Sequence, residues 1–96
     1  MAAYVIVDVS INDSEGYEEY RRQSAATVEA YGGRFLVRGG AVTTLEGAWH
    51  PRRLVVLEFE SAARAQEWWS SPEYEAIKPI RQRTTDTQMI VVEGLA

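Results

Sequence analysis

Hydrophobic and polar residues alternate along Tyr4–Ile11, which is the pattern of a β-strand with one buried face. Over about 14–31 the apolar and small residues instead recur at spacings of three and four, which predicts an amphipathic helix. The polar residues 12–14 supply oxygens that can cap the start of this helix. The glycine pair at 32–33 suits the left-handed residue that closes a helix.

The rest of the chain repeats this alternation of strands and helices. Strands are predicted at Arg34–Arg38, Leu54–Glu60 and Thr87–Glu93, and helices at about 62–70 and from Ser71 onward, the last one limited in length by Pro79. The pair Gly39-Gly40 is interpreted as a bulge within a longer strand that continues to Leu45. The order β-α-β-β-α-β predicts an α+β, ferredoxin-like domain over residues 1–96: a four-stranded antiparallel sheet with helices on one face.

Apolar side chains occur on both predicted faces of this sheet, although helices cover only one of them. One face carries Val5, Val55 and their alternating neighbours, and the other carries Tyr4, Ile6, Leu36, Leu54 and Val56. Monomers rarely expose an apolar patch of several hundred Å². A self-complementary patch is most simply covered by a second copy of the same chain. The sequence therefore predicts a homodimer formed through the sheet face.

The composition narrows the class of protein. The chain has 96 residues, 46% of them hydrophobic and 25% charged, and a net charge of −4, which is ordinary for a globular domain. This acidic balance disfavours nucleic-acid binding, which usually needs a basic face. The apolar opening ends at Asp8 and no Lys or Arg precedes Arg21, so we expect neither a signal peptide nor a membrane span. With no cysteine, there is no disulfide framework or thiolate site, and we expect a cytoplasmic protein.

Several segments together resemble a known family. They are Tyr31–Gly40 (YGGRFLVRGG), Glu46-Gly47, Trp49, Pro51–Arg53, Val55–Phe59 (VVLEF), Ser71–Tyr74 (SPEY), Ile77–Pro79 (IKP) and Arg81. In this combination the chain resembles domain-of-unknown-function family 1330 over nearly its whole length. The family's usual proline after the third strand is replaced by Glu60, which affects only the exit of that strand.

This resemblance implies membership of the dimeric α/β-barrel superfamily, in which two ferredoxin-like subunits pack sheet against sheet. It also implies a small pocket between the sheet and the helices. Relatives in the superfamily include cofactor-free monooxygenases, chlorite-dismutase-like haem proteins and small isomerases or decarboxylases. The family itself implies no particular activity, since one fold supports many functions.

Three charged residues are candidates for catalysis because strand alternation groups them on the second sheet face. Asp8, Arg38 and Glu58 would lie there among apolar side chains, where they must pair with one another or line a wet pocket. As a site, Arg38 would hold a carboxylate or enolate oxygen, and Asp8 or Glu58 would move a proton. The alternative is a structural network of ion pairs.

Five further residues are candidates for a functional site, and each also has a purely structural interpretation. His50, the single histidine, is a possible general base at a pocket mouth, although a loop position also fits a solvated side chain. Tyr17 and Tyr20 are either core residues or hydroxyls that orient a ligand. Trp69 is interpreted as a candidate rim of the pocket, because Trp68 and Trp69 point about 100° apart on a helix. Arg81 either complements a helix C-terminus or binds a substrate carboxylate.

The sequence contains no phosphate-binding glycine loop, no nucleophile elbow and no zinc-binding HExxH helix. A lone histidine without cysteine is also a poor basis for a metal or haem site, so no cofactor or metal is expected. We therefore expect a pocket for a small acidic or carbonyl compound, with cofactor-independent acid/base chemistry if the protein is an enzyme. The alternative is a non-catalytic binding or interaction module whose polar sheet residues are structural.

Overall fold

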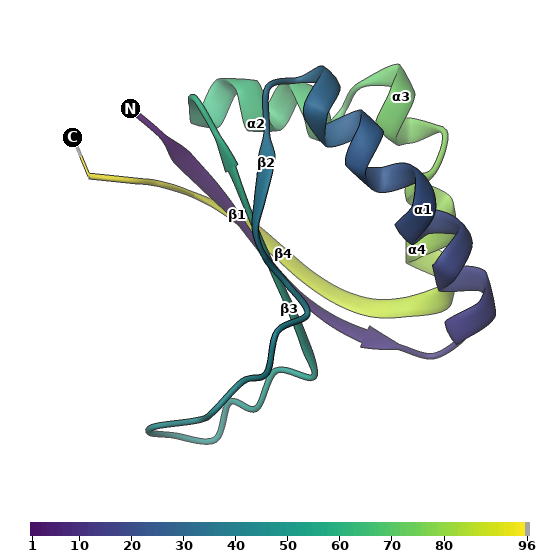
Figure 1. Cartoon of the computed structure of the whole chain (residues 1–96), viewed down its shortest axis with the longest axis vertical. Helices are drawn as coiled ribbons and strands as arrows, with labels where there is room; N and C mark the ends of the chain where they lie inside the picture. The colour runs from purple at the N-terminus through teal and green to yellow at the C-terminus, as the bar shows by residue number, and fades with distance from the viewer. Residues whose placement is uncertain (96) are drawn as a thin grey trace.

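The computed structural model describes residues 1–95. The strands are β1 (Ala3–Ile11), β2 (Arg34–Arg38), β3 (Arg53–Phe59) and β4 (Thr85–Glu93). The helices are α1 (Ser14–Ala30), α2 (Ala62–Trp69), α3 (Pro72–Glu75) and α4 (Lys78–Thr84). The strands form one antiparallel sheet in the order β2-β3-β1-β4, and the helices lie on one side of it (Figure 1). This is the predicted ferredoxin-like α+β fold.

Local signals in the sequence account for the ends of most elements. The Asp13 side chain accepts a hydrogen bond from the Gly16 amide, 3.1 Å away, and begins α1. Gly32 closes α1 with a φ of 74°, a conformation that glycine adopts without a steric penalty. Ser61 and Ser71 cap α2 and α3 in the same way as Asp13 caps α1.

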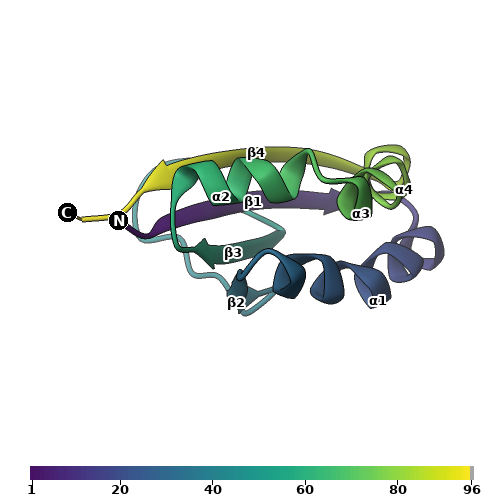
Figure 2. The ribbon, with the colours of Figure 1, turned by 90° about the horizontal axis from the view of Figure 1, so that it is seen from above.

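The core lies between the helices and the sheet face that they cover. Viewed from above, α2 lies along β1 and β4, whereas α1 lies beside β2, so the two helices cover different parts of the same sheet face (Figure 2). The largest fully buried side chains are Trp68, Tyr74 and Phe59, and the rings of Trp68 and Tyr74 are 4.2 Å apart between centroids. They pack against the inward residues of β1, beginning with Val5 and ending with Val9. This aromatic cluster joins α2 and α3 to the centre of the sheet.

The predicted bulge at Gly39-Gly40 and the continuation of the strand to Leu45 are wrong. β2 ends at Arg38, and the irregularity lies earlier, between Phe35 and Val37. Phe35 pairs with Leu57, but Arg38 pairs with Val55, so one residue is inserted between them. Because side chains alternate with a period of two, this insertion moves every later side chain of β2 to the opposite face.

Pro79 begins a helix rather than limiting one. The expected single helix after Ser71 is two short helices, and Pro79 occupies the first turn of α4. A proline is tolerated in that turn because its missing N–H would have no partner within the helix. The chain turns between α3 and α4 at Ala76-Ile77, and Ile77 is buried in the core.

Residues 39–52, called the arm here, contain neither helix nor strand. The arm projects from the sheet on the side away from the helices (Figure 1). Val42, Leu45 and Trp49 are exposed on it, Leu45 by 94%. Within residues 1–95, no helix is both long enough and apolar enough to cross a membrane.

Candidate functional site

Two of the predicted catalytic carboxylates lie on the open sheet face, and each is held by a structural partner. The Trp49 indole N–H donates to Asp8 Oδ2 over 2.8 Å and so fastens the arm to β1. Arg34 Nε donates to Glu58 Oε1 over 2.7 Å across β2 and β3. Neither carboxylate lines the two cavities described below. These contacts favour the structural alternative for Asp8 and Glu58.

Arg38 lies on the helix-covered face, so the predicted grouping of Asp8, Arg38 and Glu58 on one face is wrong. The inserted residue in β2 is the cause, because it reverses the side to which Arg38 points. Arg38 Nη2 donates to the Arg21 carbonyl, 2.9 Å away, and to Ser24 Oγ, 3.3 Å away, both on α1. Its guanidinium also lies 4.2 Å from the centre of the Phe35 ring.

His50 lies on the arm, exposed to solvent. Its Nδ1 shares a hydrogen bond of 2.8 Å with the Thr44 hydroxyl, which also donates to the Trp49 carbonyl. His50 is therefore part of the internal structure of the arm. It lines neither of the two cavities, so a general base at a pocket mouth has no geometric support in this arrangement.

The larger cavity is an open groove of about 490 Å³ between β4 and the helices α2 and α4. Its apolar lining comes from Trp68 and Trp69 and from residues of the sheet. The polar residues that line it are Gln66, Arg81, Gln82, Thr85, Asp86 and Thr87. Pockets for small molecules usually have volumes of 300–1,000 Å³ and are apolar with a few convergent polar groups, as this groove is.

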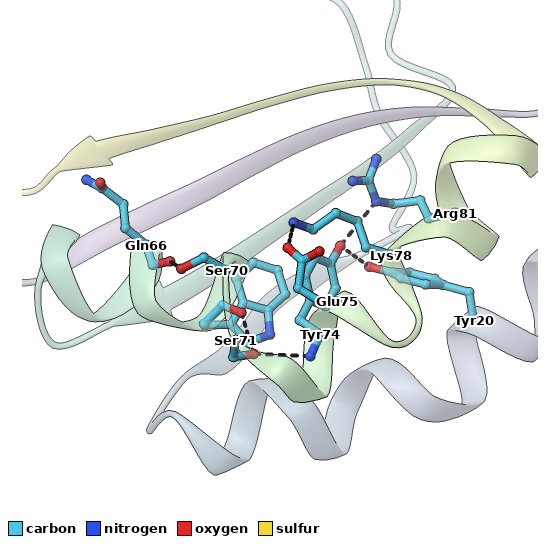
Figure 3. A network of polar contacts seen from close by, with 9 residues as sticks. Tyr20, Gln66, Ser70, Ser71, Tyr74, Glu75, Lys78 and Arg81 are labelled. Atoms are coloured by element: carbon cyan, nitrogen blue, oxygen red, sulfur yellow. Dashed lines mark hydrogen bonds and ion pairs between the residues drawn. The ribbon is translucent and has the colours of Figure 1, made fainter.

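Arg81 is the buried cation of this groove, with only 6% of its surface exposed. Its Nε donates to the Tyr74 hydroxyl over 3.1 Å, and this hydroxyl shares a bond of 2.7 Å with the Tyr20 hydroxyl (Figure 3). Among residues 1–95, no carboxylate lies within 4.0 Å of the Arg81 guanidinium. The guanidinium is thus fixed in place while its two Nη atoms make no hydrogen bond to the part of the chain described.

Trp69 lines the groove. It is 45% exposed, whereas Trp68 is 1% exposed and belongs to the core. Lys78 Nζ lies 3.4 Å from the centre of the Trp69 ring and pairs with Glu75. These contacts hold the indole at the groove opening.

The smaller cavity, of about 30 Å³, lies between α1 and the sheet and is called the inner cavity here. Tyr17 and Tyr20, both predicted ligand-binding residues, line it. Four arginines also line it and no carboxylate does: Arg21, Arg38, Arg53 and Arg81. Trp68, Arg81 and Met89 border both cavities and so form the wall between them.

Tyr20 is a hydrogen-bond donor rather than a base. Burial, together with the neighbouring Tyr74 hydroxyl, raises the pKa of the Tyr20 phenol far above its ordinary value. Tyr20 therefore keeps its proton at any physiological pH. The predicted role of Tyr20 in orienting a ligand stays open, because its side chain borders the inner cavity.

Comparison with known families identifies the chain. Residues 2–95 match the family described as "Domain of unknown function (DUF1330)". The chain belongs to the DUF1330 family. The resemblance noted in the sequence is thereby confirmed. No curated protein matches this DUF1330 chain.

Solved structures similar to this DUF1330 chain share its fold. A protein of unknown function from Rhodopseudomonas palustris is 22% identical, with a TM-score of 0.80 over 99% of this chain and 83% of that chain. HapK from Hahella chejuensis is 14% identical, with a TM-score of 0.65 over 97% and 92% of the two chains. SnoaB, a cofactor-independent oxygenase from Streptomyces nogalater, is 10% identical, with a TM-score of 0.60 over 99% and 93%. At these identities the likeness establishes the fold alone.

Sequence reasoning missed two cavity residues of this DUF1330 protein, Arg53 and Asp86. Arg53 has the same parity in its strand as the inward residues Val55 and Leu57, so extending that strand by one residue would have placed it inside. Asp86 is the second residue of β4, one position before the strand was expected to begin. Nothing in its local sequence distinguishes it from an ordinary exposed carboxylate.

Proposed function

We propose that this DUF1330 protein binds a small organic acid or carbonyl compound in the groove between β4, α2 and α4. The observation that carries the proposal is Arg81: a buried guanidinium, held through Nε by Tyr74, that faces a groove of about 490 Å³ without an acidic partner within residues 1–95. A buried cation without a partner is costly, so an anion in the groove would relieve that cost. A guanidinium also matches the planar geometry of a carboxylate.

The groove also contains the parts of a simple acid/base reaction. Arg81 would stabilise negative charge on a carboxylate or enolate oxygen. Asp86 is the one carboxylate among the described lining residues and would accept a proton, although its position in β4 has the parity of the open sheet face and its Oδ2 accepts a 3.4 Å hydrogen bond from Asn12 Nδ2. SnoaB, which shares the fold, is described as a cofactor-independent oxygenase. Cofactor-independent proton transfer is accordingly the enzymatic form of this proposal. A binding module without turnover is the second form, favoured by the structural partners of Asp8 and Glu58.

A thermal-shift screen tests binding. The panel contains small carboxylates, phenols and aldehydes, measured with wild type, Arg81→Gln, Trp69→Ala and Arg83→Gln. A ligand at a hundred times its dissociation constant stabilises by about 2.7 kcal/mol, a shift on the order of 10 °C for a domain of this size. Trp69 is half-exposed, so its variant tests the groove without disturbing the core. Arg83→Gln is the charge-matched control, since Arg83 is exposed and lines neither cavity.

We expect a hit that disappears in Arg81→Gln and Trp69→Ala and persists in Arg83→Gln. A hit that persists in both groove variants would contradict the proposal. Incubating the hit with protein and analysing it by mass spectrometry then separates the two forms: a changed mass or isomer identifies an enzyme, and an unchanged compound identifies a binding module.

For assembly, we propose a homodimer through the open sheet face, in a cytoplasmic protein. Support comes from apolar side chains that stay exposed on this face, with Ile90 59% and Val92 44% accessible, and from the apolar arm beside it. Light scattering at micromolar concentration should give twice the monomer mass for wild type. Val92→Lys should give the monomer, and Gln23→Lys on the exposed side of α1 should remain dimeric. A wild-type monomer would contradict this assembly.

A further inference from the structure

The inner cavity, separate from the groove, is lined by hydrogen-bond donors around an apolar interior. Four arginines and no carboxylate border it, in a chain whose net charge is −4. Of the four, Arg21 is paired with Glu18 at 3.3 Å. Arg38 and Arg53 have no carboxylate within 4.0 Å in residues 1–95. The adjacent strands β2 and β3 thus bring the guanidiniums of Arg38 and Arg53, neither of them in an ion pair with the described residues, to the inner cavity.

Arg53 is the more unusual of the two, because its Nε is buried and has no hydrogen-bond partner. Its guanidinium lies 5.8 Å from the centre of the Tyr17 ring and packs against Gly39. A Cβ at Gly39 would lie 2.3 Å from Arg53 Nη1, so a side chain at this position would displace the guanidinium from its present place. Buried N–H donors in proteins are almost always satisfied, so an unsatisfied one beside a cavity points to an absent acceptor.

Arg38 contributes a second guanidinium whose position is fixed from α1. Its Nη2 donates to the Arg21 carbonyl and to Ser24 Oγ, while its Nε and Nη1 have no acceptor in the described residues. The bulge in β2 makes this possible, since without it Arg38 would point to the open face. Tyr20 adds a third donor. Tyr20 and Tyr74 share one hydrogen bond, so one of their two hydroxyl hydrogens has no acceptor within residues 1–95.

When the Tyr74 hydroxyl donates to the Tyr20 oxygen, the hydrogen left without an acceptor is that of the Tyr20 hydroxyl. Of these two tyrosines, Tyr20 borders the inner cavity. The remaining lining is apolar and includes Val9, Phe35 and Leu57. The volume of about 30 Å³ admits a group of one to two water molecules in size, which suits a carboxylate head. We infer that Arg38 and Arg53 bind the carboxylate of a small organic acid at the mouth of the inner cavity, with Tyr20 donating from inside.

An NMR titration tests this site directly, because the Nε–H of an arginine gives its own ¹H–¹⁵N signal. Sodium acetate is added to the full chain at constant ionic strength, with sodium chloride and sodium phosphate as parallel titrations. We expect a saturable shift of the Arg53 Nε signal and of the Gly39 and Ser24 amides with acetate. Absence of saturation, or an equal response to chloride or phosphate, would overturn the inference.

Variants separate the site from general charge effects. Arg53→Gln and Arg38→Gln should each weaken acetate binding by about tenfold or more, as expected for losing a charge-assisted hydrogen bond. Arg52→Gln removes the same charge from the neighbouring exposed residue and should change the affinity by less than about twofold. Arg38 is exposed, so its variant keeps the test valid if Arg53→Gln fails to fold. Unchanged affinity in Arg38→Gln would refute the assignment, whatever the groove binds.

Discussion

Removing the hydroxyl of Tyr74 should destabilise the protein more than removing the hydroxyl of Tyr20, although both are buried and bonded to each other. The Tyr74 hydroxyl has two partners: Tyr20 Oη at 2.7 Å and Arg81 Nε at 3.1 Å. The Tyr20 hydroxyl has one. Tyr74→Phe therefore leaves both a phenol and a guanidinium N–H without a protein partner, whereas Tyr20→Phe leaves the Arg81 contact intact.

The structure sets the expected magnitudes. A neutral buried hydrogen bond contributes about 1 kcal/mol net, and one to a charged group about 1.5–3 kcal/mol. Tyr20→Phe should thus cost about 1 kcal/mol and Tyr74→Phe about 3 kcal/mol. In a domain of this size the larger loss lowers Tm by roughly 15 °C. Tyr31→Phe is the control, because its bond to Glu73 is exposed to solvent and should contribute little to stability.

Urea unfolding followed by far-ultraviolet circular dichroism gives the three free energies. All variants are measured at one protein concentration, because an oligomer's stability depends on it. We expect the order Tyr74→Phe, Tyr20→Phe, Tyr31→Phe from most to least destabilised, with equal m-values. If Tyr20→Phe costs as much as Tyr74→Phe, then the Arg81 contact adds no stability and the network does not hold that guanidinium.

Three other predictions follow from single contacts. Burial raises the pKa of Tyr20, so the folded state keeps a proton that the unfolded state loses above pH about 10. The resulting stabilisation is complete below that pH and is lost above it. Urea melts at pH 9 and 11 should therefore show the unfolding free energy of wild type falling by about 1.4 kcal/mol per pH unit more steeply above pH about 10 than that of Tyr20→Phe. Gly33→Ala should cost about 1–3 kcal/mol, since its Cβ would lie 2.6 Å from the buried Phe59 ring, whereas Gly40→Ala meets nothing and should cost less than about 0.5 kcal/mol in the same melts. Ser71→Ala should lower stability by about 1–2 kcal/mol, because its hydroxyl caps α3; an unchanged thermal midpoint would contradict the role of the cap.

Most of the fold could be predicted because its signals are local. The alternation in β1, the helical spacing in α1 and the capping residues each lie within a few positions of the feature they determine. The bulge could not be located, since Leu36 is an ordinary strand residue and the glycine pair after Arg38 carries the usual signature of a bulge. The position of the inserted residue depends on how β2 pairs with β3, and this pairing is not determined by the sequence of β2 alone.

The candidate site was harder to predict than the fold, because it depends on contacts between distant residues. Asp8 is bonded to Trp49 and Tyr20 to Tyr74, pairs separated by 41 and 54 positions. Residue type drew attention to Arg81 and Trp69, which line the groove, and their role in binding a ligand stays a prediction. The same reasoning placed Arg38 on the wrong face, because a single inserted residue reverses the parity on which its assignment rested.

The arrangement of Arg81 explains how one residue can serve both the core and a binding groove. The Nε atom is used for structure, since it donates to Tyr74 inside the aromatic cluster, and the two Nη atoms remain without protein partners. A long cationic side chain loses about 2 kcal/mol of rotamer entropy when it is ordered on binding. Here burial of Arg81 and its Nε hydrogen bond to Tyr74 have already imposed that cost during folding. A ligand carboxylate would therefore meet a guanidinium that is already oriented, which increases the affinity gained from each hydrogen bond.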